Sequence, residues 1–142
     1  MRVLGIDYGM RRIGLALSDP TETIATPLDT LIRRRGKRAP LSKIESIAIE
    51  KGAEHLVIGL PLNLEGNETE WSGEVRAFGA SLSKRMNLQV SFVDERMTSV
   101  RAERTVRSIG LPKTKRENKA RIDAAAAQLI LQNWLDLRKH TK

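Results

Sequence analysis

The chain contains no cysteine and only two histidines among its 142 residues. The absence of cysteine excludes a disulfide framework, a thiolate nucleophile and a cysteine-ligated zinc site. His55 and His140 are isolated from each other and from other candidate ligands, so neither a zinc site nor a catalytic triad is indicated. Candidate functional groups must therefore be sought among the other charged residues.

Aromatic residues are also scarce. A platform that stacks unpaired bases uses several exposed rings, and this chain has too few to favour one. If the partner is a nucleic acid, we expect recognition through backbone charge and shape. The five rings belong to Tyr8, Trp71, Phe78, Phe92 and Trp134.

Long hydrophobic runs are absent as well. No apolar stretch approaches the roughly 18 residues that a membrane span requires. No signal peptide is visible, because the first predicted strand begins at Arg2 and reaches an acid at Asp7. These absences predict a cytoplasmic protein without a membrane partner.

Positive charge, in contrast, is abundant. The chain has 25 Lys and Arg against 17 Asp and Glu, giving a formal net charge of +8 and a pI near 10.3. Such a balance favours a polyanionic partner, with nucleic acid ahead of an acidic membrane since no basic amphipathic helix is seen. The alternative is that the excess charge only aids solubility. The length predicts one domain, residues 1–142. We expect this domain to act as a monomer or weak homodimer.

Hydrophobic periodicity predicts an α/β fold with a mixed five-stranded sheet and helices on both faces. Three antiparallel strands come first, joined by short turns, and two parallel strands follow between helices. A capping box of Asn67 with Glu70 is expected to begin the second helix, and Gly52 to end the first. The expected strands span 2–8, 12–18, 24–31, 55–60 and 88–94, and the expected helices 40–51, 67–86, 99–108 and 120–138.

Three acids occupy places where a carboxylate is unexpected. Asp7 ends an apolar strand, Glu95 follows the strand 88–94, and Asp123 lies on the apolar stripe of the last helix. Ligands in such sheets bind at the carboxyl ends of the strands, where these acids could converge. Oxygen ligands suit Mg²⁺, and one or two such ions can promote phosphodiester hydrolysis. Spacing alone does not establish such a site, but the joint placement of the three acids favours a metal-dependent nuclease.

Each acid also has a simpler interpretation. Asp7 could bond the turn at Gly9, Glu95 could pair with an arginine, and Asp123 could favour a helix N-terminus. Asp94 is a second acid at the end of the strand 88–94. It points to the opposite face from Glu95, so only one of the two is expected to be a ligand.

Candidate nucleic-acid contacts surround these acids in the chain. Asn63 lies in the loop after a central strand, where it could touch sugar or phosphate or simply form a rigid turn. The basic residues are individually typical of solvated surface charge, whereas the cluster at 113–121 precedes Asp123 and favours phosphate binding. The candidates are Arg11, Arg12, Asn63, Arg96, Lys113, Lys115, Arg116, Lys119 and Arg121.

Four motifs in order resemble the YqgF family of small bacterial proteins related to Holliday-junction resolvases. They are the segments 5–16 (GIDYGMRRIGLA), 59–66 (GLPLNLEG), 94–98 (DERMT) and 122–132 (IDAAAAQLILQ). The resemblance implies a ribonuclease H-like fold, a role in trimming the 5′ end of the 16S rRNA precursor, and Mg²⁺ or Mn²⁺ as cofactor. It also implies that Asp7, Glu95 and Asp123 are the catalytic, metal-binding acids. Related resolvases carry a further acid where this chain has Ala126.

Three functions remain open on these grounds. The leading hypothesis is a metal-dependent endonuclease acting on precursor 16S rRNA. Structure-selective cleavage of branched DNA is the second, since the residues themselves do not separate RNA from DNA. A non-catalytic rRNA-binding assembly factor is the third, although clustered acids near phosphates would not help binding alone.

Overall fold

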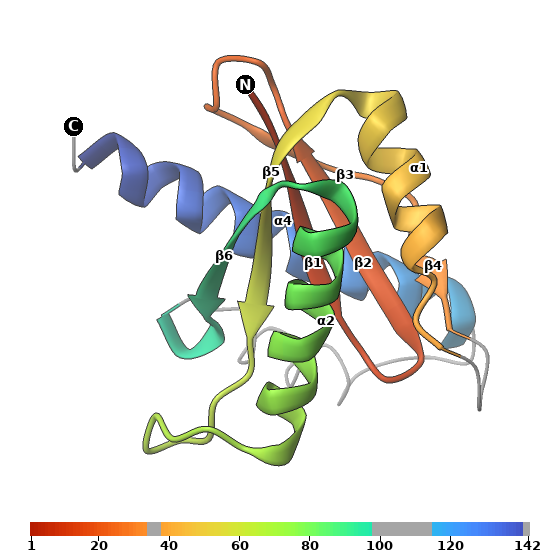
Figure 1. Ribbon diagram of the computed structural model, residues 1–142. Coiled ribbons are helices and arrows are strands. Elements are labelled where there is room, and N and C mark those ends of the chain that lie inside the picture. Colours follow the sequence, from red (N-terminus) through yellow and green to blue (C-terminus); the bar gives the residue numbers. More distant parts are fainter. Residues whose placement is uncertain (34–37, 98–114, 141–142) are drawn as a thin grey trace.

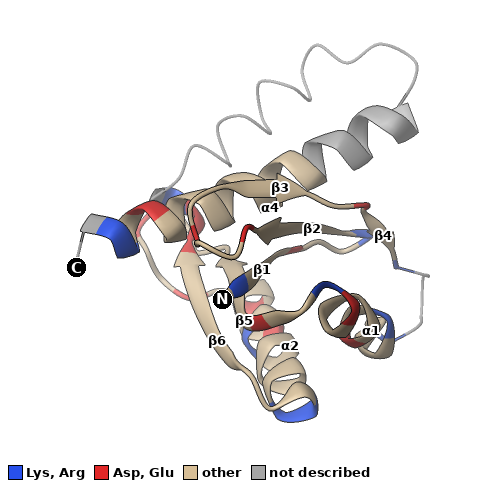
Figure 2. Cartoon of the chain, turned by 90° about the horizontal axis from the view of Figure 1, so that it is seen from above, with Lys and Arg blue, Asp and Glu red and all other residues tan. Residues whose placement is uncertain are grey.

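The protein is a three-layer α/β structure in which a mixed sheet separates two sets of helices (Figure 1). The computed structural model describes residues 1–33, 38–97 and 115–140, the side chains at 97, 115–123 and 140 excepted. Helices α1 (Leu41–Lys51) and α2 (Glu70–Met86) cover one face, and α4 (Lys115–His140) covers the other. Figure 2 shows this division from above.

The sheet has the order β3-β2-β1-β5-β6, with the short strand β4 also paired to β2. Strand β1 is antiparallel to β2 and parallel to β5, which is in turn parallel to β6. The carboxyl ends of β1, β5 and β6 therefore meet at one edge, as the sequence predicted. The strands are β1 (Arg2–Tyr8), β2 (Arg12–Ser18), β3 (Ala25–Pro27), β4 (Leu31–Ile32), β5 (Ala53–Leu60) and β6 (Gln89–Asp94).

The third predicted strand, 24–31, was wrong as one continuous element, because it consists of β3 and β4 separated by three residues. Pro27 ends β3, and it has no amide hydrogen with which to continue the ladder. The chain leaves the edge of β2 after Leu28 and pairs again where Leu31 faces Ile13. The sheet therefore has six strands within the described residues.

Alternation along the central strands divides their side chains between two cores. In β1, Leu4, Ile6 and Tyr8 pack with α1 and α2, whereas Val3 packs with α4. Strand β5 behaves in the same way, with Ile58 on the first face and Val57 on the second. Both strands are buried on both faces, which explains why their sequences are nearly continuous in apolar residues.

The ends of the helices follow local capping chemistry. Gly52 ends α1 with φ of 71°, a left-handed conformation that glycine adopts at low cost, as predicted. The predicted start of α2 was wrong: Thr69 is the N-cap, and it exchanges hydrogen bonds with Ser72. Asn67 instead closes the preceding loop, donating its amide hydrogen to the Asn63 side chain (2.8 Å).

Helix α4 begins earlier than the predicted residue 120. The basic segment expected to lead into this helix forms its first turns from Lys115, in keeping with the high helix propensity of Lys, Arg, Glu and Ala. The expected helix 99–108 lies outside the described residues. Among the helices of the described ranges, none has the length and apolarity needed to cross a membrane.

Candidate active site at the carboxyl ends of the strands

Asp7 is buried although it carries a carboxyl group, with only 4% of its surface exposed. It is the sixth residue of β1 and has the same parity as Val3, so its side chain lies on the α4 face of the sheet. Tyr8, the next residue, packs on the opposite face. The strand therefore delivers the carboxyl group of Asp7 to the space between the sheet and α4.

Glu95 reaches the same face from the end of β6. It is 5% exposed and begins the short 3₁₀ helix η1 (Glu95–Met97). Its Oε1 atom lies 2.9 Å from the position that a Cβ would take on Gly59, and Ile130 of α4 lies against the same glycine. The carboxyl group of Glu95 therefore occupies the α4 face above β5.

Strand β5 lies between the strands that carry the two acids. Ile6 pairs with Ile58, which places Asp7 beside Gly59, and Gly59 itself pairs with Val93 two residues before Glu95. The structure thus brings Asp7 and Glu95 to adjacent positions around a residue without a side chain. Gly59 belongs to one of the sequence motifs, but this role was not predicted from the sequence. A glycine inside a strand is the signal, because it marks close approach of another group.

The two acids at the end of β6 lie in different surroundings. Asp94 forms an ion pair with Arg96, whose Nη2 lies 2.7 Å from Oδ2. The Arg96 guanidinium also lies against Gly66, where a Cβ would be 2.6 Å from Nη2. Asp94 therefore holds Arg96 against the loop that follows β5. Glu95 is the acid that faces α4, and the two side chains point to opposite faces, as predicted.

Asp123 lies on α4, and its side chain is outside the described residues. The helix approaches the sheet closely at Gly5, where a Cβ would lie 2.7 Å from the Leu131 Cβ and 3.2 Å from the Ala127 oxygen. Ile130 packs at Gly59 near the end of β5, whereas Trp134 stacks on His55 near its beginning. The helix therefore crosses this face of the sheet, contacting β5 through Ile130, β1 through Leu131 and the Ala25 end of β3 through Gln128. The turn that carries Asp123 precedes these contacts in the helix.

The residues present fit a hard divalent cation. Asp7 and Glu95 offer carboxylate oxygens, which Mg²⁺ and Mn²⁺ prefer, and the missing side chain at Gly59 makes room for the Glu95 carboxyl group. Mg²⁺ keeps several of its waters, so few protein ligands suffice. Among the described side chains, no group of three or more His, Asp or Glu could hold a metal, and Asp123 is not one of them.

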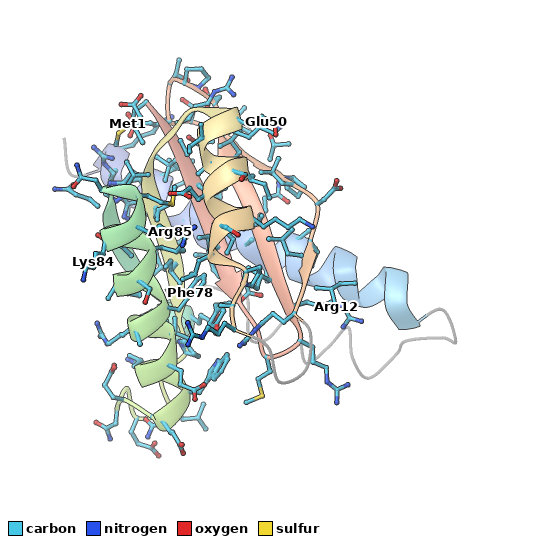
Figure 3. All side chains as sticks on the ribbon, turned by 45° about the vertical axis from the view of Figure 1, so that its right-hand side comes forward. Met1, Arg12, Glu50, Phe78, Lys84 and Arg85 are labelled. Atoms are coloured by element: carbon cyan, nitrogen blue, oxygen red, sulfur yellow. The ribbon has the colours of Figure 1, made fainter. Side chains whose placement is uncertain are left out.

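The predicted nucleic-acid contacts occupy several different settings. Arg11 is exposed on the turn between β1 and β2, and Arg12 is half-buried at the start of β2. The Gly9 amide closes this turn by donating to the Arg12 oxygen (2.9 Å). Both arginines therefore lie at the edge of the sheet that carries the acids, as Figure 3 shows for Arg12.

Two other candidates have structural partners. Arg96 pairs with Asp94, as described above. The Oδ1 atom of Asn63 accepts the amide hydrogens of Glu65 (3.1 Å) and Asn67 (2.8 Å), so this side chain organises a rigid turn. Lys113 lies outside the described residues. The backbone of Lys115, Arg116, Lys119 and Arg121 forms the first turns of α4, and their side chains are not described.

The fold itself is that of the Holliday-junction resolvases with a ribonuclease H-like sheet. RuvC of Thermus thermophilus, solved in complex with a Holliday junction substrate, matches with a TM-score of 0.59 at 18% identity, covering 99% of this chain and 97% of that chain. The fowlpox virus Holliday junction resolvase matches with a TM-score of 0.53 at 9% identity, covering 96% and 99%. At these identities the likeness concerns the fold alone.

The family is defined by the sequence. The family model described as "RuvX: Holliday junction resolvase" matches residues 1–137, so the chain belongs to the RuvX family. A protein of Maridesulfovibrio salexigens is 41% identical over 135 residues, covering 95% of this chain and 98% of the relative. One of Moorella thermoacetica is 41% identical over 136 residues, covering 96% and 95%. Both are named "Putative pre-16S rRNA nuclease", and the resemblance and the nuclease class expected from the motifs are confirmed.

Proposed function

We propose that this protein is a divalent-metal-dependent endonuclease that processes the 5′ end of precursor 16S rRNA. The observation that carries the proposal is the burial of Asp7 and Glu95 on one face, around Gly59. Two carboxyl groups on one face of the sheet offer the oxygen ligands that a divalent cation takes. The names of the relatives support the RNA substrate. Processing of bacterial rRNA takes place in the cytoplasm, where the proposal puts the protein.

Asp7, Glu95 and Asp123 are the proposed metal-binding and catalytic acids. Asp7 is held rigidly in β1, and Glu95 is held at the end of β6 against Ile130. Asp123 approaches from α4, one turn before Ala127. When bound, Mg²⁺ or Mn²⁺ polarises the phosphoryl group and stabilises the leaving oxygen. Cleavage would leave a 5′-phosphate and a 3′-hydroxyl.

The basic residues are proposed to hold the phosphates on either side of the scissile bond. Arg11 and Arg12 lie at the same edge as Asp7. The basic segment 113–121 precedes Asp123 in the chain, and its cations are expected to bind the other side. Such contacts position the strand without reading its sequence.

The test is Asp7→Asn, assayed on a transcript that carries the 5′ precursor region of 16S rRNA with Mg²⁺ present. Asparagine keeps the size of the side chain and removes its charge, so cleavage should fall by on the order of 100-fold or more. Asp136→Asn, at an exposed position on α4, is the matched control and should cleave normally. Unchanged turnover in Asp7→Asn would contradict the mechanism.

Cleavage of branched DNA is the second candidate, because the family description names a Holliday junction resolvase. Resolution of a four-way junction needs two active sites acting together. The same preparation should therefore be assayed on a four-way DNA junction, with its oligomeric state measured in the presence of that DNA. Paired incisions by a dimer would favour DNA, whereas a monomer that cuts only the rRNA transcript would favour RNA. If a variant lacking all three acids still supports rRNA maturation in cells, the role is binding alone.

A further inference from the structure

Three of the five aromatic rings of the chain gather at one place. The Tyr8 ring lies parallel to Phe78, with ring centroids 3.9 Å apart and planes inclined by 7°. Trp71 is parallel to Tyr8 as well, with centroids 5.5 Å apart and planes inclined by 3°. Tyr8 and Phe78 are buried, whereas Trp71 is half-buried. The result is a fixed stack with one partly exposed ring.

A cation belongs to the same stack. The Arg33 guanidinium lies over the Tyr8 ring, 4.5 Å from its centroid, and its Nη1 atom donates to the Gly9 oxygen (3.0 Å). The Nε atom of Arg33 is buried and has no hydrogen-bond partner among the described residues. The guanidinium is therefore held in place by the turn between β1 and β2.

The stack lies just across the sheet from the candidate active site. Tyr8 follows Asp7 directly and points to the opposite face of β1. Trp71 is in the first turn of α2, which begins after the loop that leaves β5 at the same edge. Figure 3 shows Phe78 between α2 and the sheet, and Arg12 at the β1–β2 turn. Tyr8 therefore links the two faces at this edge, because its backbone adjoins Asp7 and its ring stacks with Trp71.

We propose that Trp71, supported by Tyr8 and Arg33, forms a subsite that stacks an unpaired nucleobase next to the cleaved phosphate. A tryptophan whose plane is already fixed loses little freedom when a base stacks on it. The neighbouring arginines Arg11, Arg12 and Arg33 match the charge of the strand that carries the base. The proposal rests on the proposed nuclease function and revises the expectation that rings are too few for stacking. If Trp71 stacks an unpaired base, the protein should prefer RNA in which a single-stranded segment adjoins a duplex.

The test measures binding in an Asp7→Asn background, so that cleavage does not interfere. Trp134→Phe leaves Trp71 as the sole tryptophan, whose fluorescence is quenched by a stacked base. The probes are a blunt RNA hairpin and the same hairpin with a short single-stranded 5′ extension, compared at one salt concentration. We expect quenching by the extended hairpin alone. Replacing extension bases one at a time by abasic sites should abolish the quenching at one position.

Affinity provides an independent measurement. Trp71→Leu retains apolar bulk but has no aromatic face, and it should bind the extended hairpin about ten-fold more weakly and the blunt hairpin normally. Trp71→Phe should restore most of the difference. Trp134→Phe is the matched control, because it changes the other tryptophan, which stacks on His55 near the other end of β5.

The outcomes separate the subsite from the nuclease function. Equal quenching by both hairpins would overturn the proposed subsite, and so would quenching that survives every abasic replacement. This test does not depend on whether a Trp71 variant folds, because Trp71 is unchanged in it. Equal affinity of Trp71→Leu and the parent for the extended hairpin would also overturn it. The wild-type protein could also fail to cleave the transcript while the quenching remains specific to one position. This result would support the stacking subsite and contradict the proposed nuclease function.

Discussion

The carboxyl group of Glu95 occupies the space that a side chain on Gly59 would fill, with Oε1 2.9 Å from the expected Cβ position. The position of the Glu95 carboxyl group therefore depends on the absence of a side chain at residue 59. Glycine is required here for close approach and not for an unusual backbone angle, since its φ is not positive.

Gly59→Ala tests this relationship. The new methyl group would meet the Glu95 Oε1 and the Ile130 Cδ1 atoms, both at the ends of flexible side chains, so the fold should survive at a cost of about 1–3 kcal/mol. The carboxyl group must move, and cleavage should fall far more than stability. Cleavage rates on the rRNA transcript and urea unfolding measure the two effects.

A glycine elsewhere supplies the control. Gly73 is exposed in α2, and a Cβ there would meet nothing within 4 Å. Gly73→Ala should raise the free energy of unfolding by about 0.5–1 kcal/mol and leave cleavage unchanged. If both alanine variants lose activity equally, the site does not depend on the space at residue 59.

The neighbouring acids Asp94 and Glu95 should behave differently when neutralised. Glu95→Gln should lower cleavage by on the order of 100-fold, because Glu95 faces the proposed metal position. Asp94→Asn loses an ion pair with Arg96 that is partly exposed, worth at most about 1 kcal/mol, and should keep most of the activity. Initial rates for both variants across a Mg²⁺ titration measure this. Greater loss in Asp94→Asn would reassign the ligand.

Gln132 should contribute to stability through the edge strand. Its Oε1 accepts the Ala25 amide hydrogen and its Nε2 donates to the Thr23 oxygen, both at 2.9 Å. Gln132→Ala leaves these groups without their partner and should destabilise the fold by about 1–3 kcal/mol. Thermal unfolding measures the change. Asn133 is the adjacent control, because its buried Nδ2 has no partner among the described residues, and Asn133→Ala should cost less.

Acid should remove the contribution of Asp19. The pKa of its carboxyl group is held well below 3.8, first by the Ile24 amide and then by the Thr21 hydroxyl and Thr23 amide. Since the pKa is lower in the folded state, the stabilisation is present above about pH 4 and lost as the pH falls through the folded-state value. Asp19→Ala should therefore be less stable than wild type at pH 7, and the difference should shrink below pH 4. A constant difference in urea midpoints from pH 7 to pH 2 would contradict this.

Much of the fold could be predicted because local chemistry and tertiary structure agree. The bounds of β1 and β2 follow from apolar runs separated by Gly9, and Gly52 ends α1 as expected. The start of α2 could not be predicted, because Asn67 and Thr69 are both plausible N-caps in sequence. Asn67 is used by the Asn63 turn, a contact that a linear pattern does not contain.

The placement of two of the candidate acids in the fold could be predicted to a similar degree. Asp7 stood out as a carboxyl group at the end of an apolar strand, and the structure buries it. Alternation along the strand puts Asp94 and Glu95 on opposite faces but does not say which of them faces the site. The structure distinguishes them, because Glu95 lies with Ile130 at Gly59 and Asp94 pairs with Arg96. The stacking of Tyr8 on Phe78 joins distant segments, so the count of rings gave no hint of it.

The covering of one sheet face by α4 has a consequence for the time at which the protein becomes competent. Residues 126–135 supply half of the second core, whose other members come from β1, β2, β3, β5 and β6. During synthesis the ribosome makes every strand before it makes this helix. A nascent chain that has already exposed Asp7 and Glu95 therefore lacks the layer that encloses them. An enzyme proposed to cut ribosomal RNA would thus be assembled only after its last helix has left the ribosome that made it.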